Sequence, residues 1–136
     1  MELIGDVVRK TGEPSLLAIE AAKASRGLDI GRDSGLFRVP KVVNFDAEAG
    51  RLDFERFDGL VTLLDLAVRK DRRLAELLEK TGRALALVHE KLTLPETMKY
   101  ELPPQWSGHA EQNVFIHGDF ACINVCYHER SDELVI

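Results

Sequence analysis

The sequence is poor in cysteine, has no long apolar run and carries no excess of basic residues. Only two of its 136 residues are cysteine, whereas small secreted domains usually hold several disulfides, so we expect reduced thiols in a cytoplasmic protein. No stretch approaches the roughly 18 apolar residues of a membrane-spanning helix, and residues 1–10 do not resemble a signal peptide. The net charge of −5 argues against a nucleic-acid partner, which usually meets a basic face.

What remains is the composition of an ordinary globular domain, with 45% hydrophobic and 30% charged residues. Strand and helix signals alternate in the first part, whereas the second part is mainly helical and carries a few short strands. The sequence therefore predicts an α+β fold. Asp58-Gly59 is the best candidate for a boundary between two lobes, which divides the chain into residues 1–58 and 59–136.

In the first part we expect one strand, one helix and a pair of strands joined by a turn. Pro14 suits the first position of a helix, and Gly27 is typical of a helix stop, so residues 31–35 should be loop. Apolar and acidic residues alternate along 51–57, which indicates a strand with one buried face. The predicted elements are a strand at 1–10, a helix at 15–26 and strands at 37–45 and 51–57.

The second part is dominated by one amphipathic helix. A short helix is predicted at 62–69, and Asp71 can cap the longer helix that follows. The apolar stripe of the longer helix consists of Leu74, Leu77, Leu78, Leu85, Val88 and Leu92. We expect Leu77, Leu78 and Leu85 to be buried. After a loop at 93–112 the sequence predicts a short strand at 114–116, and then a hairpin formed by 125–127 and 133–136.

The most informative segment is the run His117-Gly118-Asp119-Phe120-Ala121-Cys122-Ile123-Asn124, which lies between two short apolar segments. Asp119 and Asn124 have the spacing of a kinase catalytic loop. A carboxylate can orient an attacking hydroxyl and accept its proton, and an amide oxygen can help to hold Mg²⁺ on the phosphates. Asp and Asn are also common turn formers. The preceding His-Gly and the flanking strands favour the catalytic interpretation.

This run resembles the catalytic loop of aminoglycoside phosphotransferases and related small-molecule kinases, a choline kinase-like family with a protein-kinase-like fold. Residues 39–43 and 50–59 resemble the paired strands of that family running into its hinge. Residues 85–89 resemble the end of its long helix. The resemblance covers nearly the whole chain in the right order, and the catalytic loop is its most specific part.

The resemblance implies ATP and Mg²⁺ as cofactors and a small-molecule hydroxyl compound as the phosphate acceptor. Asp119 would be the catalytic base and Asn124 a magnesium ligand. Lys10 of the first strand and Glu20 of the first helix would pair to hold the nucleotide phosphates. The hinge of that family binds adenine through backbone groups and apolar walls, and Glu55, Arg56 and Phe57 would lie there.

Two parts of the family pattern are missing, and they leave three interpretations open. No Gly-rich loop precedes Lys10, and the metal-binding Asp of the family would fall just beyond Ile136. We therefore expect a truncated kinase that is inactive alone, with self-association through the open edge of its last strand. The chain could instead be a non-catalytic nucleotide-binding or regulatory module. In the third interpretation it is a plain α+β domain, with Lys10 and Glu20 on a solvated surface.

The remaining histidines and cysteines have simpler explanations. His89 lies on the flank of the apolar stripe, where we expect it to pack or to cap the helix. His117 is expected to brace the loop. Cys122 and Cys126 lack the C-x2-C spacing that is usual in zinc sites, so we do not expect them to bind a metal.

Overall fold

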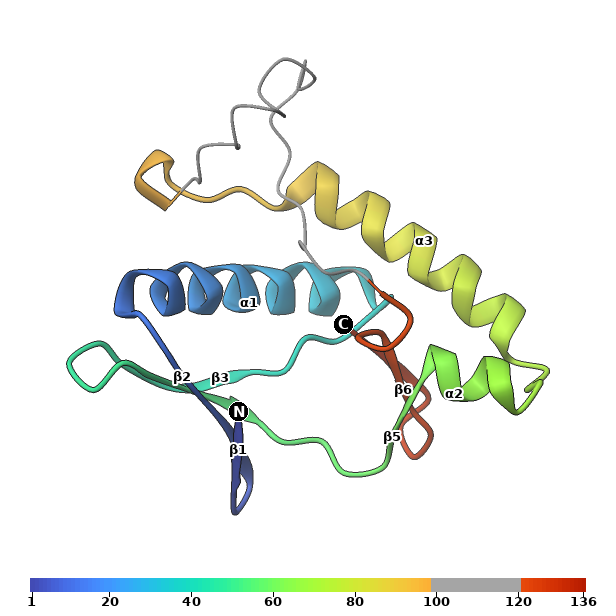
Figure 1. The fold of residues 1–136 in the computed structure, drawn as a ribbon. Coiled ribbons are helices and arrows are strands. Elements are labelled where there is room, and N and C mark those ends of the chain that lie inside the picture. Colours follow the sequence, from blue (N-terminus) through green and yellow to red (C-terminus); the bar gives the residue numbers. More distant parts are fainter. Residues whose placement is uncertain (99–120) are drawn as a thin grey trace, which may run out of the picture.

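The computed structural model describes residues 1–98 and 121–136, and within these ranges the chain is a mixed α+β protein, as predicted. Two small antiparallel sheets are combined with three α-helices (Figure 1). The elements are β1 (Glu2–Ile4), β2 (Val7–Thr11), α1 (Pro14–Ser34), β3 (Val42–Asp46), β4 (Arg51–Glu55), β5 (Leu60–Thr62), α2 (Leu63–Val68), α3 (Leu74–Lys91), a 3-10 turn (Glu96–Met98), β6 (Cys126–His128) and β7 (Glu133–Val135). The expected strand at 114–116 lies outside the described residues.

The first ten residues form a hairpin and not the single strand that we expected. β1 and β2 pair in antiparallel register, with Glu2 opposite Arg9. Gly5 reverses the chain between them with φ of 54°, a conformation that costs little only for glycine. The first sheet has the order β1-β2-β4-β3, and α1 lies along one of its faces (Figure 1).

Helix α1 begins at Pro14, as predicted, but continues past Gly27 to Ser34. The prediction of a stop at Gly27 and a loop at 31–35 was wrong because these glycines serve packing. A Cβ on Gly31 would lie 2.4 Å from the carbonyl oxygen of Phe37, so the segment after the helix folds back against its bare backbone. The helix ends instead at Gly35, which has φ of 64° and donates its N–H to the Gly31 carbonyl.

The strand predicted at 37–45 begins only at Val42. Phe37 is buried in the core, and Arg38 forms a parallel bridge with Val135 of β7. The turn after β3 and the strand β4 occur as predicted, but β4 does not bury apolar side chains alone. Asp53 is 5% exposed because Arg9 of β2 pairs with it across the sheet.

The second part of the chain contains the predicted short helix and hairpin. Thr62 and Asp65 form a capping box that starts α2. Strands β6 and β7 form the hairpin, and β5 joins its other side in the order β5-β6-β7. Asp71 does not cap α3 at its N-cap position. Its carboxylate accepts the N–H of Arg73 in the turn just before the helix.

The buried face of α3 only partly follows the expected stripe. Leu77 is buried and Leu85 is half-buried, but Leu78 is 51% exposed, so its predicted burial was wrong. The face that meets the core instead passes through Leu77, Thr81 and Ala84. Thr81 fits there because its hydroxyl donates to the Leu77 carbonyl at 2.7 Å.

A single core cluster joins the two parts of the chain. Ile30 and Phe37 from the first part pack with Leu63, Leu66 and Leu134 from the second. This cluster places the end of α1 against α2 and the second sheet. None of the helices in the described ranges is long and apolar enough to cross a membrane.

Candidate functional site

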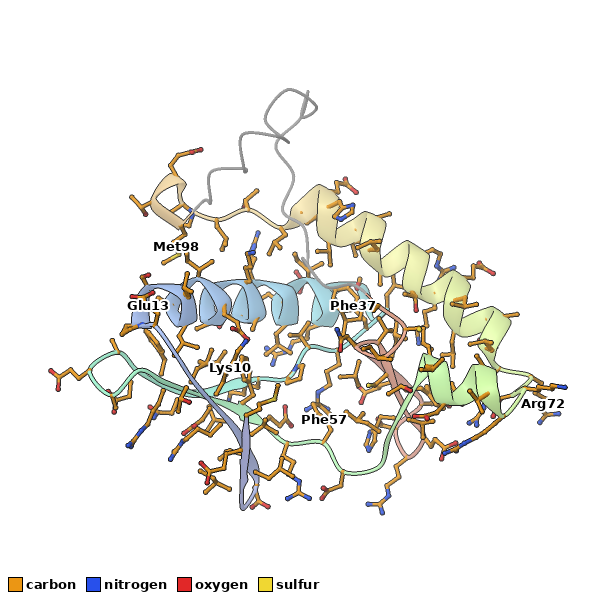
Figure 2. All side chains as sticks on the ribbon, viewed as in Figure 1. Lys10, Glu13, Phe37, Phe57, Arg72 and Met98 are labelled. Atoms are coloured by element: carbon orange, nitrogen blue, oxygen red, sulfur yellow. The ribbon has the colours of Figure 1, made fainter. Side chains whose placement is uncertain are left out.

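Lys10 and Glu20, which the sequence paired only by their order, lie in contact. Lys10 is on β2, opposite Leu52 of β4, and Glu20 is on the part of α1 that faces this sheet. The Lys10 Nζ donates to both carboxylate oxygens of Glu20 at 2.6 and 2.8 Å, and Lys10 lies between the sheet and the helix (Figure 2). Their side chains are 41% and 38% exposed, so a solvent-borne anion can reach this ammonium group.

The neighbouring residue Arg9 points to the other side of the strand, because side chains alternate along β2. It forms two hydrogen bonds with Asp53, at 2.7 and 2.8 Å. These bonds, made by a cation, hold the pKa of Asp53 below its usual value. The sequence analysis missed this pair. The sequence indicated this pair only through a basic residue on one predicted strand and an acidic residue on another, without showing that the two strands pair.

The linker at residues 56–59 connects the two sheets and begins beside the first hairpin. The backbone N–H of Arg56 donates to the carbonyl of Asp6 at 3.1 Å, and its guanidinium donates to the carbonyl of Gly5 at 3.2 Å. The guanidinium also lies 2.9 Å from the Asp58 carboxylate. The Arg56 amide is therefore already bonded within the protein.

The side chains of Glu55 and Phe57 both contact Arg38. A guanidinium nitrogen of Arg38 lies 2.7 Å from a carboxylate oxygen of Glu55. The Arg38 guanidinium carbon lies 4.7 Å from the centroid of the Phe57 ring, and the His128 ring meets the same phenyl ring edge-on at 5.8 Å. These two predicted hinge residues are thus fixed by a residue that the sequence analysis did not single out.

Asn124 occupies a turn that is anchored to the start of α2. Its backbone N–H donates to the Ala121 carbonyl at 2.8 Å. The first amides of α2 have no partners within the helix, and two of them bind this segment: Leu63 donates to Val125 and Leu64 to Cys122. This places the exposed Asn124 just before the start of β6. Asp119 and His117 lie outside the described residues.

A pocket of about 400 Å³ lies beside the linker, but most of the predicted site residues do not line it. Of these residues only Glu55 contributes, and Lys10, Glu20 and Asn124 do not. The other walls come from the end of α1, the Arg38 segment, α3 and β7. The candidate site therefore consists of the paired residues and the linker, and not of this pocket.

The cysteines and acidic residues add no metal centre to the described ranges, where no group of three potential ligands is arranged to hold an ion. Both cysteines are free, and burial raises the pKa of the Cys126 thiol, which favours its neutral form. Asn124 is an exposed residue, and its side chain carries an amide oxygen, a hard ligand of the kind that Mg²⁺ accepts.

With this geometry established, we compared the chain with known proteins. No family, curated protein or solved structure matches it. The function must therefore be argued from the residues themselves. The described ranges offer a reachable cation on β2, a tethered linker and an anchored turn that carries Asn124.

Proposed function

We propose that this chain is part of a small-molecule kinase of the aminoglycoside phosphotransferase type. The observation that carries the proposal is the contact between Lys10 and Glu20. In protein kinases a strand lysine paired with a helix glutamate must be in place for phosphoryl transfer. The exposed ammonium of Lys10 is oriented by Glu20 in the same way, and it is suited to an anionic phosphate.

The order of the elements supports the same proposal. The strand with Lys10 is followed by the helix with Glu20, a pair of strands, the linker and two helices, and then in the sequence by the segment that contains Asp119. β5 follows the linker directly and pairs with β6, with Thr62 opposite Cys126. This pairing links the linker to the turn that holds Asn124. The segments proposed to bind adenine and metal are therefore joined through one small sheet.

Each residue has a defined part in the proposed reaction. Asp119 accepts the proton of the substrate hydroxyl as its oxygen attacks the γ-phosphorus of ATP, and ADP leaves with the electrons of the broken P–O bond. Lys10 would bind the phosphates and Asn124 would help to hold Mg²⁺, which would supply positive charge next to the transferring group. The segment from Glu55 to Phe57 would contact adenine through backbone groups other than the Arg56 amide.

Binding of Mg-ATP to the purified chain, followed by calorimetry, tests the proposal. We expect Lys10→Ala to weaken Mg-ATP binding by about tenfold or more, since it removes a hydrogen bond to a charged group. Adenosine lacks phosphates, so its affinity should not change. The half-exposed Lys10–Glu20 pair adds little stability, and circular dichroism should show a folded variant. Lys91→Ala, at an exposed position on α3, is the matched control.

Wild-type protein that binds neither Mg-ATP nor adenosine would exclude the proposed function. Equal affinities of the wild type and Lys10→Ala for Mg-ATP would exclude the phosphate-binding role of Lys10. Where phosphate transfer to small alcohols or aminoglycosides is measured, Asp119→Ala should reduce it by about 10²–10⁴. Nucleotide binding without transfer is expected both of a kinase part that is inactive alone and of a non-catalytic nucleotide-binding module, so only detectable transfer would favour the kinase over the module.

A further inference from the structure

The backbone of Arg38 joins the first part of the chain to the edge of the second sheet. Its N–H donates to the Leu134 carbonyl at 2.7 Å, and its carbonyl accepts the N–H of Ile136 at 3.0 Å. The segment that carries Arg38 leaves the end of α1 and is held close to that helix by the glycine contact at Phe37. The backbone of Arg38 is therefore held by β7 and by the end of α1, independently of any contact of its side chain.

The side chain of Arg38 contacts the start of the linker and strand β7 of the second sheet. One guanidinium nitrogen lies 2.7 Å from Glu55, where β4 ends, and another lies 3.6 Å from Glu133, where β7 begins. The guanidinium carbon lies 4.7 Å from the centroid of the Phe57 ring, within the linker itself. The Phe57 ring also contacts the ring of His128, at the end of β6. One cation thus contacts the strand before the linker, the linker, and the sheet after it.

We infer that Arg38 is a positioning residue that locks the angle between the two sheets. We call Arg38 and its four partners Glu55, Phe57, His128 and Glu133 the Arg38 latch. Its consequence for nucleotide binding rests on the proposed function, since Lys10 lies on the first sheet and Asn124 beside the second. Its consequence for the shape of the molecule rests on the contacts alone.

The physical reason lies in the guanidinium group and in the linker. A guanidinium has five donors in a planar fork, so it can bind two carboxylates and stack on an aromatic ring at once, which an ammonium group cannot. The linker includes Gly59 at φ of 79°, and small residues at the ends of elements commonly act as hinges. Each ion pair is about one-third exposed and weak alone. The latch acts by fixing orientation.

The test compares Arg38→Lys with Arg9→Lys, which changes the same residue type in a pair whose two members lie within one sheet. Residual dipolar couplings of the backbone amides report the relative orientation of β1–β4 and β5–β7. In the wild type, both sheets should fit one alignment tensor. Arg38→Lys should require two tensors of different magnitude, whereas Arg9→Lys should still fit one. A single tensor for Arg38→Lys would overturn the latch.

Nucleotide affinity supplies the second readout. If the latch holds the sheets in the binding geometry, and its loss leaves about a tenth of the molecules in that geometry, the Kd for Mg-ATP rises about tenfold. Arg9→Lys should leave this Kd unchanged. An unchanged Kd in Arg38→Lys, despite a second tensor, would overturn the role of the latch in binding. Absence of Mg-ATP binding by the wild type would count against the proposed function and leave the tensor result to decide the latch.

A second variant keeps the test decisive if Arg38→Lys does not fold. Phe57→Leu removes the aromatic face that Arg38 and His128 contact, and it leaves the backbone bonds of Arg38 in place. It should also separate the two alignment tensors. A Phe57→Leu protein that fits one tensor as well as the wild type would contradict the latch independently.

Discussion

Asp53 keeps its charge at a buried position of the first sheet because Arg9 donates hydrogen bonds to both of its carboxylate oxygens. Removing a charge from water is costly, and the arrangement persists only when a partner satisfies the buried group. The pKa of Asp53 is therefore lowered, chiefly by the hydrogen bonds from Arg9. The stability of the sheet should depend on the ionisation of this one carboxyl group.

We predict that Asp53→Asn is most destabilising near pH 7 and less so in acid. An aspartate titrates near pH 4 in an unfolded chain, at about its reference value. Because the folded-state pKa lies lower, the stabilisation is complete above about pH 4 and is lost as the pH falls through the folded value. Urea unfolding between pH 7 and 2 should show the difference from wild type shrinking below about pH 4. Glu48→Gln, at an exposed turn position, is the control.

The contacts of single residues were predictable only where neighbouring elements dictate them. Lys10 and Glu20 lie on consecutive elements, and a family resemblance gave each a role, so their pairing could be expected. Arg9 and Asp53 depend on the register of β2 against β4, which the sequence did not reveal. The side chain of Arg38 contacts Glu133, which lies 95 positions later in the chain. No local pattern marks such a residue.

At the level of elements, two helical glycines show how differently the same residue is used. Gly31 is buried in α1, and a Cβ there would lie 2.4 Å from a backbone oxygen of the following segment. Gly82 is exposed on α3, and a Cβ there would meet no atom within 4 Å. Gly31 permits close approach, whereas Gly82 only adds flexibility to the unfolded chain.

Alanine substitutions at these two positions should change stability in opposite directions. Gly82→Ala should raise the free energy of unfolding by about 0.5–1 kcal/mol, because glycine is a poor helix former. Gly31→Ala forces the Phe37 segment away from the helix and should lower it by about 1–3 kcal/mol, the usual effect of overpacking. Chemical denaturation of both variants measures the values. A stabilised Gly31→Ala would contradict the close packing of α1.

The start of α1 was predictable from the sequence, whereas its end was not, and the prediction that Asp71 caps α3 was wrong. Pro14 and the Thr62–Asp65 capping box act through their own turn, so they can be recognised locally. Gly27 gave a false stop because its role is decided by Val39, which lies 3.3 Å from its Cβ position. The stripe of α3 failed at Leu78 for a similar reason: the elements packed against a helix select its buried face.

At the scale of the whole molecule, the two predicted lobes share one core. The linker at residues 56–59 separates the two sheets. However, Phe37 and Ile30 of the first part are buried with Leu66 and Leu134 of the second. The edge of β7, which we expected to be open, is bonded to Arg38 at Leu134 and Ile136. Self-association through this strand stays a prediction, with fewer free backbone groups to support it.

The shared core predicts that the described parts unfold as one cooperative unit. Phe37→Ala should lower the unfolding free energy by about 3–5 kcal/mol, the usual cost of emptying a buried phenyl site. In native-state hydrogen exchange, amides of β2 and of β6 should lose protection by the same amount, because both report the same global opening.

Leu52→Ala is the reciprocal test, since Leu52 is fully buried in the first sheet and is not part of the shared cluster. It too should lower the protection of β6. If β6 keeps its wild-type protection in Leu52→Ala while β2 loses it, the two sheets unfold separately, and the shared core does not couple them.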